Sequence, residues 1–331
     1  MFGPKTGLRL LVAVLISALA IAAPTSGASA APSEYSNTLT FINGKFIDGK
    51  TLDGLSPGSP DFGFTLEAML QRKALGQKLL DQLPAVKANL ADTTVFSKSA
   101  VSSYAYSTSG ATKTVRPGLA GKFLFVSAAL GVPNAPLRNA LIADLKKAIA
   151  SNGIIAGSTG NTFDYAWAIL GLSSNNQQKV ANTVAQKLIG FQHADGGFGT
   201  DQTGDTLTSS SDSTGIALQS LALAKRSATS SQAARLQKGL VSAGAYLRST
   251  LVTGDHWEAW GDIDVNGTAY AAMGLKAAGA KITAIQSWLK ARLAPTGGLV
   301  TPWSNGLGDI FATAQSIAPL LGLSYLDLLS K

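Results

Sequence analysis

The stretch DSTGIALQSLALA, residues 212–224, decides how the chain folds, because its pattern recurs along the sequence. An aspartate comes first, one or two small residues follow, and then comes an apolar run rich in Ala and Leu. Four other stretches share this pattern, and they begin at Asp61, Asp164, Asp264 and Asp309. A sixth run, PGLAGKFLFVSAALG at 117–131, lacks the aspartate and fills the long gap between the first two. A recurrence every 50 residues or so is typical of a repeat architecture.

A second kind of helix is expected between these runs. Leucine, isoleucine and valine recur there every three or four residues, with Lys, Arg and Gln on the other face, in residues 135–150, 176–189, 235–247 and 281–293. A helix that is apolar all round is buried, whereas an amphipathic helix faces water on one side. The alternation therefore predicts an inner ring of helices wrapped by an outer ring, near residues 62–75, 118–131, 164–173, 213–225, 267–279 and 309–321 for the inner ring.

Six such pairs predict an all-α fold, the (α/α)6 toroid, in one domain over residues 31–331. The N-terminal stretch SEYSNTLTFI, residues 33–42, supplies a short last outer helix. The dipeptide Asn43-Gly44 is also a good hairpin signal, so a hairpin is the alternative for this stretch.

The stretch FQHADGGFG, residues 191–199, ends one outer helix and leads toward the inner helix that follows Asp212. Glycine supplies the left-handed residue that stops a helix, and the aspartate at the start of each apolar run is expected to cap the next helix. The stretch is therefore expected to be a turn in which Gly196 or Gly197 has a positive φ and His193 is a loop residue. The alternative is a catalytic corner in which Asp195 poises His193 as a general base.

The N-terminus has the composition of a secretory signal peptide over residues 1–30. Lys5 and Arg9 precede an apolar run at 10–23, and Ala28-Ser29-Ala30 forms a cleavage signature. The apolar run is short for a membrane span, which needs about 20 residues. We therefore expect a secreted, extracellular protein with no stable membrane span after cleavage.

The composition excludes several classes of site. The chain has 331 residues and no cysteine, which excludes disulfides, a thiolate zinc site and a cysteine nucleophile. Its formal net charge is +8, but the basic residues are scattered and no nucleic-acid-binding motif accompanies them. The basic excess is therefore interpreted as a solvated surface, and no nucleic-acid partner is expected.

The unit LIGFQHADGGFG followed by DSTGIALQSL resembles the repeat of squalene cyclases and protein prenyltransferase β subunits, which share the α/α toroid. In addition, DSTGIALQSLAL, DIDVNGTAYAAM and AQSIAPLLGLSYLDLL resemble segments of the helical domain of intrinsic factor and transcobalamin, the vitamin B12 carriers. The resemblance to the carriers implies cobalamin as a candidate ligand, with Asp212, Asp262 or Asp264, and Gln315 as contacts. It also implies a small β domain that clamps the ligand, which here would be a separate lid protein.

The sequence lacks residues that the prenyltransferase and cyclase reactions require. A prenyltransferase zinc site needs cysteine, and His193 and His256 lie about one repeat apart, so no metal site is expected. The acidic D-x-D-D stretch of the cyclases has its nearest match at Asp262-Ile263-Asp264-Val265, which lacks the last acid. A toroidal glycosidase or lyase would need paired carboxylates. No catalytic residue is assigned.

The inner helices are expected to start at one end, where their free N–H groups and aspartates would form a polar mouth. The candidate ligand-binding residues at this mouth are Asp212, Asp262, Asp264, Asp309, Gln315, Tyr270 and Trp303. We expect the mouth to bind a small molecule, corrinoid-like for example, or a cell-envelope component. The alternative is a terpenoid cyclase-like or carbohydrate-active enzyme that uses the mouth aspartates. Buried paired acids would favour the enzyme, and simple capping hydrogen bonds would favour binding.

Overall fold

The computed structural model describes residues 33–329, apart from 48, 55, 83–93, 134, 159 and 201–207. The expected signal segment, residues 1–30, lies outside the described residues. Helices make up most of the described chain, and its strands form only two short hairpins. The predicted all-α class is therefore confirmed.

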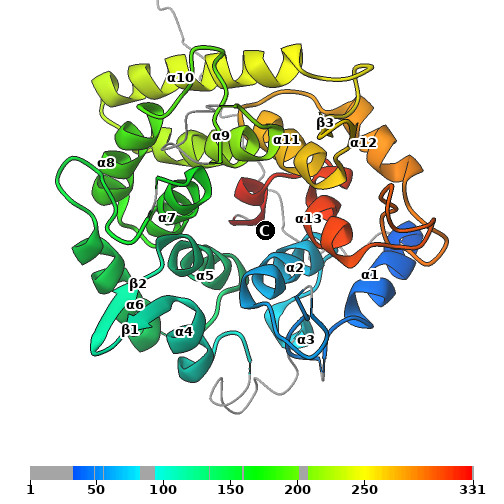
Figure 1. Ribbon diagram of the computed structural model, residues 1–331, viewed down its shortest axis with the longest axis horizontal. Helices are drawn as coiled ribbons and strands as arrows, with labels where there is room; N and C mark the ends of the chain where they lie inside the picture. Colours follow the sequence, from blue (N-terminus) through cyan, green and yellow to red (C-terminus); the bar gives the residue numbers. More distant parts are fainter. Residues whose placement is uncertain are drawn as a thin grey trace, which may run out of the picture.

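Six helices are apolar nearly all round and lie closest to the centre of the molecule (Figure 1). These inner helices are α2 (Phe62–Ala74), α5 (Pro117–Leu130), α7 (Thr162–Ser174), α9 (Ser211–Lys225), α11 (Val265–Ala277) and α13 (Ile310–Leu320). Each begins and ends within two residues of its predicted range. Each contacts the next in this order, and α13 contacts α2. Nearly all residues of α9 are buried, as expected of a helix enclosed on every side.

The remaining longer helices pack on the outside of the inner six (Figure 1). They are α1 (Ser36–Asn43), α4 (Lys98–Tyr104), α6 (Ala135–Ala148), α8 (Gln178–Ile189), α10 (Ser230–Ser249) and α12 (Thr283–Ala291). Each buries one face only. In α6, for example, Leu141 and Leu145 are buried whereas Lys146 and Lys147 are exposed.

The smaller elements complete the chain. They are η1 (Ser33–Tyr35), α3 (Leu79–Gln82), the hairpin of β1 (Tyr106–Ser109) with β2 (Thr112–Val115), the hairpin of β3 (Glu258–Ala259) with β4 (Asp262–Ile263), and η3 (Tyr325–Leu329). The N-terminal stretch forms helix α1, which ends at Gly44, and not a hairpin at Asn43-Gly44.

Glycines let two pairs of inner helices approach backbone to backbone. A Cβ atom on Gly215 of α9 would overlap the carbonyl group of Tyr270 on α11, and one on Gly274 of α11 would lie 2.6 Å from the carbonyl oxygen of Gly215. Gly121 of α5 and Gly171 of α7 repeat this arrangement one repeat pair earlier. The small residues of the repeat thus set the spacing of the inner helices.

The aspartates at the helix starts were predicted as caps, and three of the five are. Asp61, Asp264 and Asp309 each accept a hydrogen bond from a backbone N–H three residues later, at 2.8 to 2.9 Å. The prediction is wrong for Asp164 and Asp212, which lie inside the first turn of their helices. Asn161 and Ser210, which stand upstream, take the N-cap position there, because Asn, Asp and Ser are about equally good at it.

The turn at residues 191–199 has the expected geometry. Gly196 has φ +91°, and the backbone N–H of His193 donates to the carbonyl oxygen of Gly197 at 3.0 Å. The hydroxyl of Ser209 lies 2.9 Å from Nδ1 of His193 and donates to Asp195 at 2.8 Å. Ser209 therefore stands between His193 and Asp195, an arrangement that does not resemble a poised general base.

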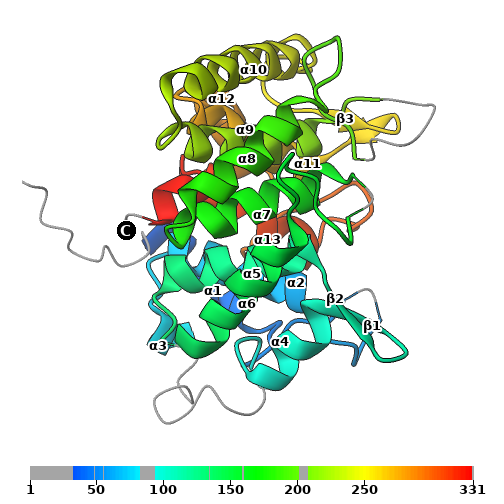
Figure 2. The same ribbon diagram turned by 90° about the vertical axis from the view of Figure 1, so that its left-hand side faces the viewer.

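The C-terminal segment enters the space between the inner helices. Helix η3 contacts α2, α5, α9 and α11, and the ring of Tyr325 is fully buried against Phe125 and Trp167. Figure 2 shows the C-terminus on the side opposite β1, β2 and β3. Because β2 leads into α5 and β4 into α11, the starts of these inner helices lie on the hairpin side.

Candidate functional site

The inner helices start at a common end, which we call the mouth. Contacts between residues in the first turns of neighbouring helices establish this. The backbone N–H of Gly118 donates to Asp164 at 3.2 Å, and Asn266 donates to the carbonyl oxygen of Phe311, also at 3.2 Å. The rings of Phe64 and Phe311 stack with centroids 4.4 Å apart. The free N–H groups and positive dipole ends of the helices thus gather at this end.

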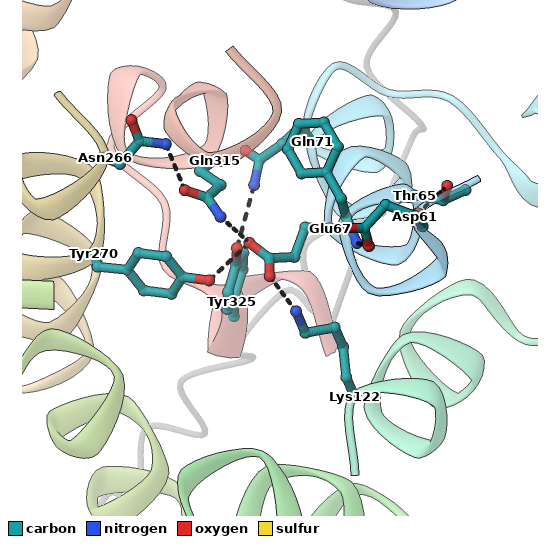
Figure 3. Close-up of polar contacts among 10 residues, drawn as sticks. Asp61, Thr65, Glu67, Gln71, Lys122, Asn266, Tyr270, Gln315 and Tyr325 are labelled. Atoms are coloured by element: carbon teal, nitrogen blue, oxygen red, sulfur yellow. Dashed lines mark hydrogen bonds and ion pairs between the residues drawn. The ribbon is translucent and has the colours of Figure 1, made fainter. Parts of the chain in front are cut away.

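Below the mouth lies a buried charged cluster that centres on Glu67 of α2 (Figure 3). One carboxylate oxygen of Glu67 forms a salt bridge with Lys122 of α5. The other accepts hydrogen bonds from the hydroxyl of Tyr270, at 2.7 Å, and from Nε2 of Gln315, at 2.8 Å. The amide of Asn266 donates to Gln315 Oε1 at 2.6 Å. We call these five residues the axial cluster.

The members of the cluster that touch Glu67 share one place in the repeat. Each stands six residues after the N-cap of its helix, as does Glu67 itself: Asp61 for Glu67, Arg116 for Lys122, Asp264 for Tyr270 and Asp309 for Gln315. Six residues of α-helix rise by about 9 Å. The repeat therefore brings one layer of side chains together at that depth below the mouth. Trp167 and Ile216 hold the same position in α7 and α9.

The C-terminal segment provides the floor beneath this layer. The hydroxyl of Tyr325 lies 3.5 Å from Nε2 of Gln71, and its backbone N–H donates to Oε1 of Gln219 at 3.0 Å. The rings of Tyr325 and Tyr270 meet edge to face, with centroids 6.3 Å apart. Burial raises the pKa of both tyrosine hydroxyls well above their ordinary value, and the charge of Glu67 raises it further. Both phenols thus stay protonated, so the hydroxyl of Tyr270 can donate to Glu67.

The ion pair of the cluster is well shielded from water. The side chain of Glu67 is 4% exposed and that of Lys122 is 12% exposed. The ammonium of Lys122 also lies 5.0 Å from the ring centroid of Trp167, a cation–π contact. A buried ion pair is weak evidence for stability, because the cost of desolvation offsets the attraction. The pair is therefore a candidate functional group, because glutamate and lysine are rarely found in a core.

The predicted site residues are distributed unevenly. Tyr270 and Gln315 lie in the axial cluster. Asp264 and Asp309 cap their helices at the mouth, as described above. Asp212 is half-buried in the first turn of α9, where it accepts hydrogen bonds from the hydroxyl of Ser210 at 2.5 Å and from the N–H of Ser213 at 2.6 Å.

The other two predicted residues lie on exposed loops and hairpins. Asp262 is exposed on β4 and accepts a hydrogen bond from the N–H of Ile263 at 2.7 Å. Trp303 is 61% exposed in the loop before α13. The cluster thus contains two of the seven predicted residues.

Two mouth carboxyl groups have perturbed pKa values. Burial raises the pKa of Asp264, and the charge of Asp212 raises it further, whereas hydrogen bonds from the backbone N–H groups of Gly267 and Asn266 lower it. Burial also raises the pKa of Asp164. Both carboxyls therefore hold a proton to higher pH than a free aspartate would.

Sequence reasoning missed Glu67 and Lys122, as well as the floor residues Gln71 and Tyr325. A signal for two of them was present. Glu67 is one of only three glutamates in the chain, and it stands in the apolar run DFGFTLEAML. Lys122 stands in the apolar run PGLAGKFLFVSAALG. A single charge within an apolar stretch marks a residue that needs a buried partner.

Two searches over the described residues limit the other options. No group of three or more His, Cys, Asp or Glu side chains in this part of the chain is placed to hold a metal ion. No helix within the same residues has the length and apolar character to cross a membrane.

Comparisons with known proteins bear on the fold alone. No model of a protein family matches the chain, and no curated protein matches it. One solved structure, described as the crystal structure of a protein from Actinoplanes, is similar with a TM-score of 0.56 and 13% sequence identity. The match covers 89% of this chain and 98% of that chain. The similarity shows that the two proteins share their fold over nearly their whole length.

Proposed function

We propose that the chain is a secreted (α/α)6 toroid that binds a small polar molecule at the mouth, above the axial cluster. The toroid is supported by the order of contacts among the inner helices, which returns from α13 to α2, and by the outer position of α6, α8, α10 and α12. The resemblance to the repeat of squalene cyclases and prenyltransferase β subunits supports the same architecture.

The observation that carries the proposal is the buried Glu67–Lys122 ion pair, held by Tyr270 and Gln315. Hydrogen bonds hold the polar side chains of the cluster in place before any ligand arrives. A ligand that binds them therefore does not have to pay the entropy cost of ordering these side chains. Aromatic rings that are half-buried, those of Phe163 and Phe311, lie one turn nearer the mouth. A few convergent polar groups among apolar and aromatic side chains are the usual lining of a small-molecule site.

A ligand rich in amides fits this chemistry, since amides both donate and accept hydrogen bonds. A corrinoid such as cobalamin carries many amide side chains, in agreement with the resemblance to the B12 carriers. A cell-envelope component is the other candidate ligand. A separate β-domain protein would then close the mouth over the ligand as a lid.

Binding is favoured over catalysis because most of the acidic side chains at the mouth already accept hydrogen bonds within the protein. Asp61, Asp264 and Asp309 are engaged as helix caps, and the carboxylate of Glu67 accepts from three donors. One observation favours the second candidate, an enzyme that acts on a terpenoid or a carbohydrate. The pKa of Asp164 and that of Asp264 are raised, and a general acid needs a raised pKa to hold its proton.

The experiment is to purify the protein from its own culture medium and to record its absorption spectrum, in which a bound corrinoid is visible. A titration of the ligand-free protein with cyanocobalamin follows. We expect Gln315→Leu to weaken binding at least about tenfold, which is the loss of about 1.4 kcal/mol expected for a buried hydrogen bond. The matched control is Gln178→Leu, at the start of the outer helix α8, which should bind as the wild type does. Equal affinity in both variants would place the ligand elsewhere.

The same samples separate the two candidate functions. If the protein is a binder, Asp264→Asn should change affinity by less than about tenfold, because asparagine keeps the cap and can still form a hydrogen bond with a ligand. Turnover of a terpenoid or polysaccharide by the wild type, lost in Asp264→Asn, would instead establish the enzyme.

A further inference from the structure

A surface pocket lies between the outer helix α10 and the inner helices α9 and α11. Its volume is 380 Å³, and it is lined by the last turns of α9 and α11 and by residues 237–248 of α10. None of its lining residues belongs to the axial cluster or to the first turn of an inner helix. Small and apolar side chains form much of the lining: Ala222, Leu240, Val241, Ala277, Ala278 and Ala280.

Three cations stand in the lining of this pocket, namely Lys225, Arg226 and Arg248. No carboxylate is among the lining residues in the described part of the chain. A second pocket of 240 Å³ shares Ala280 with the first and adds Lys276 and Lys281. Cations that gather around concave surface without acids attract anions into it.

The position of Arg248 has no explanation in its own helix. A cation in the last turn of a helix ordinarily stabilises the negative end of the dipole. The guanidinium of Arg248 instead lies back along α10, because a Cβ atom on Gly244 would stand only 3.3 Å from its NH1 atom. The glycine thus leaves room for a guanidinium at the pocket and away from the C-terminal carbonyl groups.

We propose that this pocket binds a small organic phosphate. Arg226 and Arg248 each carry a guanidinium group, which can donate two parallel hydrogen bonds to phosphate oxygens, and Lys225 adds a third positive charge. The alanine, leucine and valine side chains supply an apolar surface for the organic part of the ligand. The volume lies near the lower limit for ligand pockets, which favours a small molecule. This site is independent of the mouth and of the function proposed for it.

The test uses phenyl phosphate as the probe and isothermal titration calorimetry as the measurement. We expect saturable binding by the wild type and a loss of at least about tenfold in affinity in the double variant Arg226→Gln/Arg248→Gln. The matched control is Arg235→Gln, an exposed arginine of α10 that does not line the pocket, and it should keep wild-type affinity. Thermal melts of all variants check that each is folded.

Further binding measurements, with lipid vesicles and with inorganic phosphate, identify the source of the phosphate and the role of the apolar lining. Binding to phosphatidylcholine vesicles that contain phosphatidic acid, lost in the double variant, would assign the site to a lipid headgroup. Phenyl phosphate binding without vesicle binding would assign it to a soluble phosphate. Inorganic phosphate should bind more weakly than phenyl phosphate. The proposal is overturned if phenyl phosphate shows no saturable binding, if inorganic phosphate binds equally well, or if Arg235→Gln weakens binding as much as the double variant does.

Discussion

Replacing Lys122 by methionine should lower the free energy of unfolding by about 3–5 kcal/mol, the usual cost of breaking a buried ion pair by removing one partner. Methionine keeps most of the length and apolar contact of the lysine stem, so the change isolates the charge. The carboxylate of Glu67, whose side chain is 4% exposed, would be left without a cation. Each kcal/mol moves the melting temperature of a large domain by about 2 °C, so the melting temperature should fall by about 6–10 °C.

Substitutions of Glu67 alone, and of Glu67 together with Lys122, separate the loss of one charge from the loss of the whole ion pair. Glu67→Gln leaves the ammonium of Lys122 without a carboxylate and should also destabilise the protein. The double variant Glu67→Gln/Lys122→Met leaves no uncompensated charge. Because replacing a whole buried ion pair is often neutral or stabilising, we expect the double variant to be more stable than Lys122→Met alone by at least about 2 kcal/mol.

The assay is urea unfolding at pH 7, followed by circular dichroism, on the wild type and the three variants. Lys147→Met, an exposed lysine of the outer helix α6, is the control and should change stability by no more than about 0.5 kcal/mol. If the two single changes add within about 0.5 kcal/mol in the double variant, the residues are not coupled. The interpretation of the axial cluster as one buried charge network would then be wrong.

Three further predictions concern the packing, the caps and the turn. Gly274→Ala should lower the free energy of unfolding by about 3 kcal/mol or more, since its Cβ would stand 2.6 Å from a carbonyl oxygen of α9, where carbon and oxygen normally stay about 3.3 Å apart; an unchanged melt would show that the helices separate freely. Asp264→Ala should cost about 0.5–2 kcal/mol, whereas Asp264→Asn should be at least as stable as the wild type at pH 7. The pKa of Asp264 is raised in the folded protein, so the aspartic acid contributes stability that is present at low pH and is lost as the pH rises through that pKa. Thermal melts from pH 3 to pH 8 should show the difference in melting temperature between Asp264→Asn and the wild type becoming smaller as the pH falls. Gly196→Ala should cost more than about 1 kcal/mol because of its positive φ, and His193→Ala should cost no more than about 1 kcal/mol and leave activity intact; a silent glycine together with an inactive histidine variant would restore the catalytic corner.

The inner helices were predictable because each contains a long apolar run, which indicates burial. In five of the six, an aspartate near the start of the run gives a second, independent signal. The prediction of the caps was wrong only where a competing residue stands upstream. Asn161 precedes Asp164 and caps α7 with its side chain, whereas Ser210 precedes Asp212 and takes the N-cap position of α9 without a side-chain hydrogen bond to the backbone.

The hairpin of β3 with β4 was not predicted, because its turn lacks the usual sequence signal. Trp260 and Gly261 both have positive φ, at 54° and 83°, as the type I′ turn requires. Asparagine or aspartate normally takes the first of these positions, whereas tryptophan is rare there. The stretch DHWEAWGD, residues 255–262, in which the turn lies, therefore carries no recognisable hairpin signal.

The axial cluster could not be predicted from any one stretch, because its members come from four helices. Lys122, Tyr270 and Gln315 lie 55, 203 and 248 residues from Glu67 in the sequence. What brings them together is the common distance of six residues from each N-cap, given that the inner helices start at one end. Once the repeats are aligned on their caps, that column of the sequence holds an acid, a lysine, a tyrosine and a glutamine where a packed core would hold aliphatic residues. The polar character of a single column is thus the property of the repeat that points to a ligand, and it becomes visible only when the architecture fixes the alignment.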